Sequence, residues 1–387
     1  MDLVVTYCER WDTPLRTSKH HYIERMAADG HRILYVEMPA NPLSAIRRFG
    51  EFTSQVLPRI RAGVEEVAEN IWVMTGFVPL PYHSALRGIL DRPLVNQINQ
   101  RILLPRLKAA QASLGFQAPI LLSYYPLAFP IIRELGVART IFHIVDEWQG
   151  MAGIPRSMAK LTQAMLGHAD LTIVTSGRLF ERYKHSAKRI ELLRHGTDIA
   201  LFGAVASGMV RSDPRILAMP GNKIGYYGAL HKLDTKLITQ VAEARPDWSF
   251  AFVGPVSGGQ GMGGHQVFPP NIHFLGEKLR ADLPAFLAGL DAFWMPFAVN
   301  ELTKSMCPIK IFEVLSAGIP LVSSDLDECR AVAGHHALFA KSADEHLAQL
   351  ERASSLRNPE ETRLRAESMQ DYDWDHRYQK FLRLLQH

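Results

Sequence analysis

Residues 291–324 read DAFWMPFAVNELTKSMCPIKIFEVLSAGIPLVSS and contain two apolar runs on either side of a helical segment. The runs at 292–295 and 321–323 show no polar alternation, which is typical of strands buried on both faces of a sheet. Between them, Pro308 suits the first position of a helix and Gly318 suits its left-handed C-terminal cap. A strand, a short helix and a second strand in this order predict a parallel sheet covered by helices.

The same alternation extends along the whole chain. Further strands are predicted at 3–8, 32–38, 71–75, 119–125, 140–145 and 171–175 in the first half, and at 224–227, 249–254 and 272–275 in the second. Residues 203–222 lack periodicity and collect Gly, Pro and Ser, which indicates a linker. Because 387 residues are too many for one hydrophobic core, we predict two Rossmann-like, doubly wound α/β domains facing across a cleft, at 1–202 and 223–370. An aromatic-rich helix at 371–387 is expected to pack back towards the N-terminal domain.

Composition limits the kind of protein and where it works. Cys8, Cys307 and Cys329 have neither paired nor zinc-type spacing, so we expect a reducing compartment and no structural metal. The N-terminus carries an acid rather than the basic residues of a signal peptide. The longest apolar run, 283–297, is interrupted by an aspartate and is too short to span a bilayer. These features predict a cytoplasmic protein, and the modest net charge of +4 indicates no nucleic-acid partner.

The helix between the two quoted strands carries the residues with the clearest chemistry. Lys310 and Glu313 are three positions apart and share one face. The helix N-terminus offers free backbone N–H groups and a positive dipole end to a phosphate, and Lys310 adds a full charge for a diphosphate. Glu313, one turn deeper, is placed to accept hydrogen bonds from a diol such as a ribose. The alternative is a solvent-exposed helix pair without a ligand.

The stretch 291–324 resembles the donor-binding signature of GT-B glycosyltransferases, particularly family-four retaining enzymes of exopolysaccharide and teichuronic-acid-type biosynthesis. Residues 224–229 (IGYYGA) resemble the first glycine loop of the donor domain, and residues 271–276 (NIHFLG) resemble the strand and turn that hold the nucleobase. Weaker likenesses lie at 10–12, 30–37, 169–176 and 195–198. The resemblance implies the GT-B architecture, a UDP-linked sugar as donor substrate, and neither a cofactor nor a metal.

The resemblance assigns donor-binding roles to residues that match the family signature. They are Gly228, Lys232, Gly276, Met306, Pro308, Ile309, Lys310 and Glu313. Family-four enzymes commonly carry two glutamates separated by seven residues; Glu313 matches the second, and Ser305 stands at the first. A hydroxyl can hydrogen-bond a sugar but supplies no charge, so the sugar specificity and the retaining outcome stay open. Lys232 lies near the family's phosphate-binding lysine, but the Arg–Lys pair is incomplete.

In the first domain, Asp146 and Glu147 end a predicted strand at the expected cleft. In inverting relatives a similarly placed acid takes the proton from the acceptor hydroxyl, whereas in retaining relatives the leaving phosphate is thought to do so. Together with Ser305 they are the catalytic candidates. The alternatives are an N-cap for Asp146 and simple solvent exposure for Glu147. Arg16, His20, Tyr124 and Tyr125 are candidates for contact with the acceptor or with the donor phosphate, and each also has a purely structural interpretation.

Basic residues are concentrated between residues 83 and 110, where apolar residues interleave with them at helical spacing. The basic residues are Arg87, Arg92, Arg101, Arg106 and Lys108. One interpretation is an amphipathic surface that contacts anionic lipid headgroups at the inner face of a membrane. The other is a core helix with a solvated basic face.

Taken together, the residues and the resemblance predict an enzyme, a glycosyltransferase of the hexosyltransferase type. It would move a sugar from a nucleoside diphosphate sugar to a hydroxyl of a glycan, lipid-linked or small-molecule acceptor. An epimerase of nucleotide sugars with the same fold, or a non-catalytic nucleotide-sugar-binding protein, are the alternatives. A dinucleotide oxidoreductase is disfavoured because no G-x-G-x-x-G follows the first strand.

Overall fold

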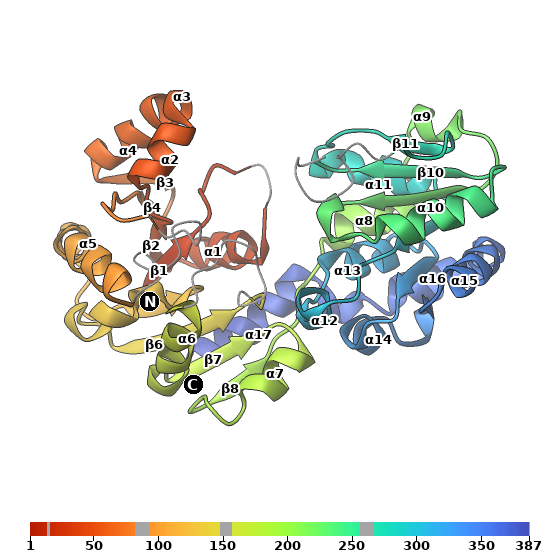
Figure 1. Ribbon diagram of the computed structural model, residues 1–387. Helices are drawn as coiled ribbons and strands as arrows, with labels where there is room; N and C mark the ends of the chain where they lie inside the picture. Colours follow the sequence, from red (N-terminus) through yellow and green to blue (C-terminus); the bar gives the residue numbers. More distant parts are fainter. Residues whose placement is uncertain (14–15, 82–92, 148–156, 256–266, 387) are drawn as a thin grey trace. The chain divides into compact units, whose positions relative to one another are not determined.

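The computed structural model describes residues 1–13, 16–81, 93–147, 157–255 and 267–386 (Figure 1). The chain divides into two compact units, Met1–Arg194 together with Lys380–His387, and His195–Gln379. Each unit is built on one sheet with helices packed against it (Figure 1). The two-domain α/β class predicted from the alternation of strands and helices is confirmed.

In the described part of the first unit, eight strands form one sheet in the order β3-β4-β2-β1-β5-β6-β7-β8. Their bounds are β1 Asp2–Cys8, β2 Arg32–Glu37, β3 Val64–Ala68, β4 Ile71–Met74, β5 Ile120–Ser123, β6 Arg139–Ile144, β7 Leu171–Val174 and β8 Ile190–Leu192. Neighbouring strands run parallel, except that β3 pairs antiparallel with β4 at the edge. The sequence did not predict β3, because its exposed glutamates give it the charged character of an edge strand rather than an apolar run.

The helices of the first unit cover this sheet and extend from it. They are α1 Ser18–Ala28, α2 Pro42–Arg47, α3 Phe49–Glu51, the π-helix η1 Phe52–Val56, α4 Leu57–Ala62, α5 Pro93–Ser113, the 3-10 helix η3 Pro126–Glu134, α6 Ser157–His168 and α7 Gly177–Tyr183. The last turns of α17 (Trp374–Gln386) also pack here. Phe381 stacks on Tyr22 with ring centroids 4.4 Å apart, and Arg139 donates a 2.8 Å hydrogen bond to the Leu385 carbonyl.

In the described part of the second unit, six parallel strands form one sheet in the order β11-β10-β9-β12-β13-β14. Their bounds are β9 Lys223–Tyr227, β10 Ser249–Val253, β11 Ile272–Phe274, β12 Ala292–Met295, β13 Leu321–Ser324 and β14 Ala337–Ala340. The α-helices are α8 Ile199–Ala206, α9 Pro214–Leu217, α10 Thr235–Ala244, α11 Leu283–Ala288, α12 Glu301–Ser305, α13 Ile309–Ser316, α14 Asp327–Ala333, α15 Ala343–Ser355 and α16 Pro359–Glu367. Short 3-10 helices are η5 Leu230–Lys232, η6 Arg280–Asp282, η7 Gly334–His336 and η8 Gln370–Tyr372.

The residues predicted as a linker, 203–222, are instead part of the second unit. They contain the end of α8 and all of α9, and Ile216 is fully buried. Asp213 caps α9 and forms a 2.6 Å ion pair with Lys278. The linker prediction was wrong because Gly and Pro also mark the ends of short helices, so their enrichment does not by itself indicate an irregular connection. None of the helices in the described residues is both long and apolar enough to cross a membrane.

Candidate functional site

Three glycines stand at the carboxyl ends of neighbouring strands in the second unit. Gly228, Gly254 and Gly276 follow β9, β10 and β11 and have φ angles of 125°, 145° and 73°. Gly228 donates a 2.8 Å hydrogen bond to the Val253 carbonyl, and Gly254 donates a 2.9 Å hydrogen bond to the Gly276 carbonyl. A Cβ on Gly254 would collide with the carbonyl oxygen of Gly228. The strand ends are therefore joined backbone to backbone, an arrangement that requires glycine.

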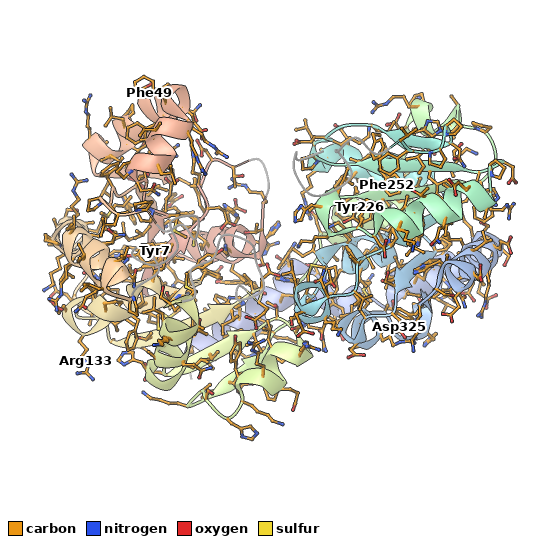
Figure 2. All side chains as sticks on the ribbon, in the orientation of Figure 1. Tyr7, Phe49, Arg133, Tyr226, Phe252 and Asp325 are labelled. Carbon is orange, nitrogen blue, oxygen red and sulfur yellow. The ribbon has the colours of Figure 1, made fainter. Side chains whose placement is uncertain are left out.

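Lys310, in the first turn of α13, occupies the space that Gly228 leaves open. A Cβ on Gly228 would collide with the terminal carbon and the ammonium of this lysine. The ammonium lies 5.7 Å from the ring centroid of Tyr226, which neighbours Phe252 of β10 (Figure 2). Burial lowers the pKa of Lys310 to about 8, although the Glu313 carboxylate opposes the shift. A partly desolvated cation is a place where a phosphate would be stabilised.

Glu313 is buried inside the second unit, with 4% of its surface exposed. The Tyr227 hydroxyl donates a 2.7 Å hydrogen bond to its Oε2, and Arg280 Nη1 donates a 2.8 Å hydrogen bond to its Oε1. Burial and this carboxylate together raise the pKa of Tyr227 well above its usual value. The alternative of a solvent-exposed Lys310–Glu313 pair is therefore wrong. Each carboxylate oxygen still has a lone pair for a further donor such as a ribose hydroxyl.

Helix α13 begins and ends close to where its sequence predicts. Pro308, predicted at the first helical position, is instead the N-cap, so the helix begins one residue later, at Ile309. At the other end Gly318 adopts a φ of 69°, and two backbone hydrogen bonds close the last turn in a Schellman motif. The predicted left-handed glycine cap is confirmed.

Two further predicted donor residues lie beside Lys310. Lys232 Nζ is 3.2 Å from the Met306 sulfur, and its positive charge adds to the lowering of the Lys310 pKa. Ala298 donates a 3.0 Å hydrogen bond to the Lys232 carbonyl, which ties the segment after β9 to the segment after β12. Gly228, Gly254 and Gly276 together form an edge that we call the glycine edge. The structure thus brings this edge into one region with Lys232, Met306, Lys310 and Glu313.

Ser305 ends α12 next to these residues, and only 1% of its surface is exposed. Its hydroxyl donates a 3.0 Å hydrogen bond to the Glu301 carbonyl one turn earlier in the same helix. This bond satisfies the hydroxyl locally. A role for Ser305 at a sugar remains a prediction.

In the first unit, side chains rather than glycines follow the central strands. Glu9, directly after β1, accepts a 2.6 Å hydrogen bond from the Thr17 hydroxyl and is ion-paired with the buried Lys19. The Lys19 ammonium lies 5.2 Å from the ring centroid of Tyr124 and 5.8 Å from that of Tyr125. The two tyrosines follow β5, so this cluster joins the carboxyl ends of two adjacent strands.

Arg16 precedes α1, and His20 lies in its first turn. His20 is fully buried, and its Nδ1 accepts a 3.2 Å hydrogen bond from the Thr17 amide, which caps the helix. Burial lowers the pKa of His20 to about 4, so the ring is neutral at pH 7. Arg16 donates a 2.8 Å hydrogen bond to the Trp11 carbonyl and pairs with Glu24 at 3.3 Å. These contacts shape the loop after β1 and position it beside the Glu9–Lys19 pair.

Asp146 and Glu147 follow β6. Asp146 is half-buried, and its charge contributes, after burial, to the raised pKa of Tyr125. Glu147 is 3% exposed, pairs with Arg182 at 3.0 Å and accepts a 3.2 Å hydrogen bond from Tyr183. The simple solvent exposure considered for Glu147 is therefore wrong. The N-cap alternative for Asp146 depends on residues 148–156, which lie outside the described residues.

Comparison with known proteins identifies the second unit. Residues 221–354 match the family model described as "Glycosyl transferases group 1". This stretch contains the glycine edge, Lys310 and Glu313. The second unit carries a glycosyl transferases group 1 domain.

Relatives and solved structures extend this finding. The chain is 24% identical over 214 residues to the Bacillus subtilis protein named "Putative teichuronic acid biosynthesis glycosyltransferase TuaH", and the match covers 51% of this chain and 53% of that protein. The match thus spans about half the length of this curated relative. An E. coli structure described as "Trehalose-6-phosphate from E. coli bound with UDP-2-fluoro glucose" aligns with 100% of this chain and 99% of its own at a TM-score of 0.68 and 15% identity. Anabaena Alr3699/HepE in complex with UDP-glucose aligns over the same shares at a TM-score of 0.64 and 14% identity. The fold is GT-B.

Sequence reasoning missed Arg280 of the second unit and Glu9 of the first, whereas Lys19 was among the residues expected in the loop after the first strand. Arg280, which holds Glu313, begins η6 shortly after the Gly276 turn. Glu9 and Lys19 lie on either side of the loop after β1. For Glu9 a signal existed, since polar residues directly after buried parallel strands lie at the ligand-binding edge. For Arg280 the sequence gives no periodicity or spacing that links it to Glu313.

The predicted basic helix is only partly within the described residues. Arg87 and Arg92 lie outside them, whereas Arg101, Arg106 and Lys108 are exposed on α5. They belong to the first unit, not to the group 1 domain.

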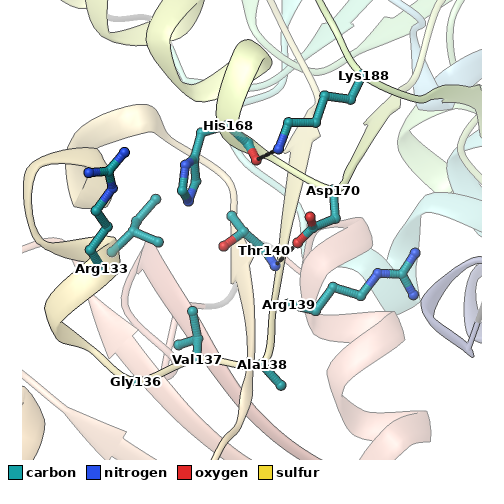
Figure 3. Close-up of a pocket in the computed structure, with 10 residues that line it drawn as sticks. Arg133, Gly136, Val137, Ala138, Arg139, Thr140, His168, Asp170 and Lys188 are labelled. Atoms are coloured by element: carbon teal, nitrogen blue, oxygen red, sulfur yellow. Dashed lines mark hydrogen bonds between the residues drawn. The ribbon is translucent and has the colours of Figure 1, made fainter.

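A hollow of about 260 Å³ in the first unit lies at the amino ends of β6 and β7 (Figure 3). Lys188 at its rim donates a 2.7 Å hydrogen bond to the His168 carbonyl, and Asp170 accepts a 2.8 Å hydrogen bond from the Thr140 amide. These bonds join neighbouring elements of the fold. Ligands of open parallel sheets bind at the opposite, carboxyl ends of the strands, so we assign this hollow a structural role.

Proposed function

We propose that this protein is a glycosyltransferase that uses a nucleoside diphosphate sugar, UDP-linked in the first instance. The acceptor is a hydroxyl of a glycan, a lipid-linked sugar or a small molecule. The observation that carries the proposal is the position of Lys310, whose ammonium lies against Gly228 at the open backbone edge of the sheet. A diphosphate would pair with this cation, while Glu313 one turn away suits the ribose. Two solved structures of the same fold are described as holding UDP-2-fluoro glucose and UDP-glucose, which supports a UDP-sugar donor.

The test begins with donor binding. UDP-glucose, UDP-galactose, UDP-N-acetylglucosamine and GDP-mannose are added singly, and the melting temperature is followed, because a ligand of the native state stabilises it by mass action. We expect at least one UDP-sugar to raise the melting temperature at concentrations well above its dissociation constant.

The same donors are then incubated with glycan, lipid-linked and small-sugar acceptors. A glycosyltransferase releases UDP together with a glycosylated acceptor, detected by chromatography and mass spectrometry. Conversion of one nucleotide sugar into another would instead indicate the epimerase. Binding with no turnover of any acceptor would indicate a nucleotide-sugar-binding protein, and no binding of any donor would contradict the proposal.

We further propose that the protein works in the cytoplasm and contacts an anionic membrane surface through α5. Leu94, Ile98 and Ile102 recur every four residues on this helix, and 58%, 39% and 47% of their surfaces are exposed. Arg106 and Lys108 are exposed on the same helix. Exposed apolar side chains flanked by cations suit the boundary between lipid headgroups and acyl chains, and each basic group there contributes about 1 kcal/mol.

Liposome sedimentation tests this contact. Binding to vesicles with anionic lipid should fall steeply from low to high salt, and neutral vesicles should bind poorly. The triple variant Arg101→Gln, Arg106→Gln, Lys108→Gln should lose binding without losing nucleotide affinity. A matched triple variant in the second unit, Arg330→Gln, Lys341→Gln, Arg352→Gln, should still bind. If the wild type ignores anionic vesicles at low salt, α5 is only a solvated helix and a soluble acceptor is favoured.

A further inference from the structure

Arg280 has one hydrogen-bonding group that the described residues do not satisfy. Its Nη1 donates to Glu313 at 2.8 Å, and the guanidinium carbon lies 5.3 Å from the ring centroid of Phe202 on α8. Its Nη2 is buried and has no hydrogen-bond partner among the described residues. A guanidinium is a rigid fork whose two terminal nitrogens lie side by side, so the unsatisfied donor is next to the Glu313 carboxylate.

This arrangement is costly unless something completes it. A buried donor without a partner loses its hydration and gains nothing in return. The carboxylate beside it is held on both oxygens, by Tyr227 and by Arg280, and cannot rotate freely. The two groups present an acceptor and a donor next to each other. A hydroxyl group, like a water molecule, can donate to the first and accept from the second.

We infer that Arg280 recognises the ribose of the donor nucleotide. In this assignment, which rests on the proposed function, the ribose 2′-hydroxyl donates to Glu313 and accepts from Arg280 Nη2. Arg280 therefore has two tasks: its Nη1 fixes the carboxylate, and its Nη2 contacts the sugar. A 2′-deoxyribose removes this hydroxyl partner, and the site should discriminate against it. Sites built to hydrogen-bond a hydroxyl reject analogues that lack it, because their buried polar groups are left unpaired.

Isothermal titration calorimetry with UDP, ADP and GDP, each beside its 2′-deoxy counterpart, tests the inference. For the base that the wild type prefers, we expect the ribonucleotide to bind about tenfold more tightly than the deoxyribonucleotide, the amount that one hydrogen bond to a charged group contributes. Arg280→Lys keeps a positive partner for Glu313 but lacks the second fork nitrogen. It should weaken binding of the ribonucleotide about tenfold, leave binding of the deoxyribonucleotide nearly unchanged, and so abolish the preference.

Arg280→Gln serves as a second variant, and its melting temperature without nucleotide reports whether the domain remains folded. Arg330→Gln, at an exposed ion pair of the same unit, should change neither affinity. If Arg280→Lys weakens ribo- and deoxyribonucleotides equally, or if it weakens neither, Arg280 does not recognise the ribose and the inference is overturned. If the wild type binds no nucleoside diphosphate, the proposed function fails first and this assignment falls with it.

Discussion

The two sheets end differently at their carboxyl edges. In the second unit, β9, β10 and β11 are followed by Gly228, Gly254 and Gly276, whose backbones contact one another directly. In the first unit, β1 and β6 are followed by Glu9 and by the Asp146–Glu147 pair, so carboxylates and their partners fill the corresponding edge. An edge without side chains leaves room for a diphosphate, which every nucleotide sugar carries. A side-chain edge suits a ligand that differs between related proteins, because side chains can be exchanged without rebuilding the fold.

The strongest way to break this contrast is to add a side chain to the glycine edge. Gly254→Ala should destabilise the second unit by about 3 kcal/mol, since a Cβ there meets the Gly228 carbonyl at a φ that alanine rarely adopts. Nucleotide binding should be lost as well. Gly276→Ala is the matched control, because its φ is also positive but nothing lies within 4 Å of its Cβ position; it should cost only about 1 kcal/mol. If urea denaturation shows that both variants lose the same unfolding free energy, then backbone strain, not contact between the strand ends, makes this edge glycine-rich.

The next largest effect should come from Lys310. Lys310→Ala should weaken nucleoside diphosphate binding roughly tenfold or more, because a charge-assisted contact to phosphate is lost in a partly desolvated site. Calorimetry with UDP measures the loss of affinity, and the melting temperature shows whether the variant is folded. Glu313→Gln should also weaken binding of UDP without a sugar attached. A loss that appears only with the intact sugar nucleotide would assign Glu313 to the sugar instead of the ribose.

Asp146 tests the side-chain edge. Because the chain resembles retaining enzymes, Asp146→Asn should lower the transfer rate about tenfold or less, and nucleotide affinity should stay within about twofold since Asp146 lies in the other unit. Proton NMR of the new glycosidic bond should show the anomeric configuration of the donor. Complete loss of transfer, together with an inverted product from the wild type, would instead make Asp146 the general base.

The smallest expected effect is a pH dependence of donor binding. Burial holds the pKa of folded Lys310 at about 8, below its ordinary value of 10.5. The protonated form binds phosphate, so affinity for UDP should fall about fivefold as the pH rises from 7.5 to 9. Between pH 8 and 10.5 the unfolded chain binds more protons than the folded chain, so stability without ligand should rise with pH there. Lys310→Met should remove both trends, and their persistence would show that another group titrates.

Local sequence determined much of the region proposed to bind the donor. The strands β12 and β13 and the helix between them follow from residues close in the chain, namely two apolar runs, Pro308 and Gly318. Lys310 and Glu313 share a helix face for the same local reason. These features were predictable because helix periodicity, capping and strand burial depend on residues within about one turn or one strand of each other.

The faces of α5 show where local reasoning fails. Apolar spacing left two interpretations of this helix open, and the core interpretation requires Leu94 and Ile98 to be buried, yet both are exposed. The buried face instead carries Asn96 and Asn99, whose side-chain amides donate hydrogen bonds of 3.0 and 2.7 Å to the carbonyls of Leu127 and Leu80. An asparagine can be buried where distant backbone groups satisfy it, and no periodicity in the sequence reveals that partner.

The sequence by itself therefore determined the alternation of strands and helices, the division into two α/β domains, and the lysine–glutamate helix of the donor region. Only the tertiary structure decided that Arg280 and Tyr227 hold Glu313, that Glu147 is buried against Arg182, and that residues 203–222 belong to the second unit. Propensity and periodicity depend on neighbouring residues. Burial, ion pairing and the contact between the Gly228 and Gly254 backbones depend on residues far apart in the chain, which only the folded sheet brings together.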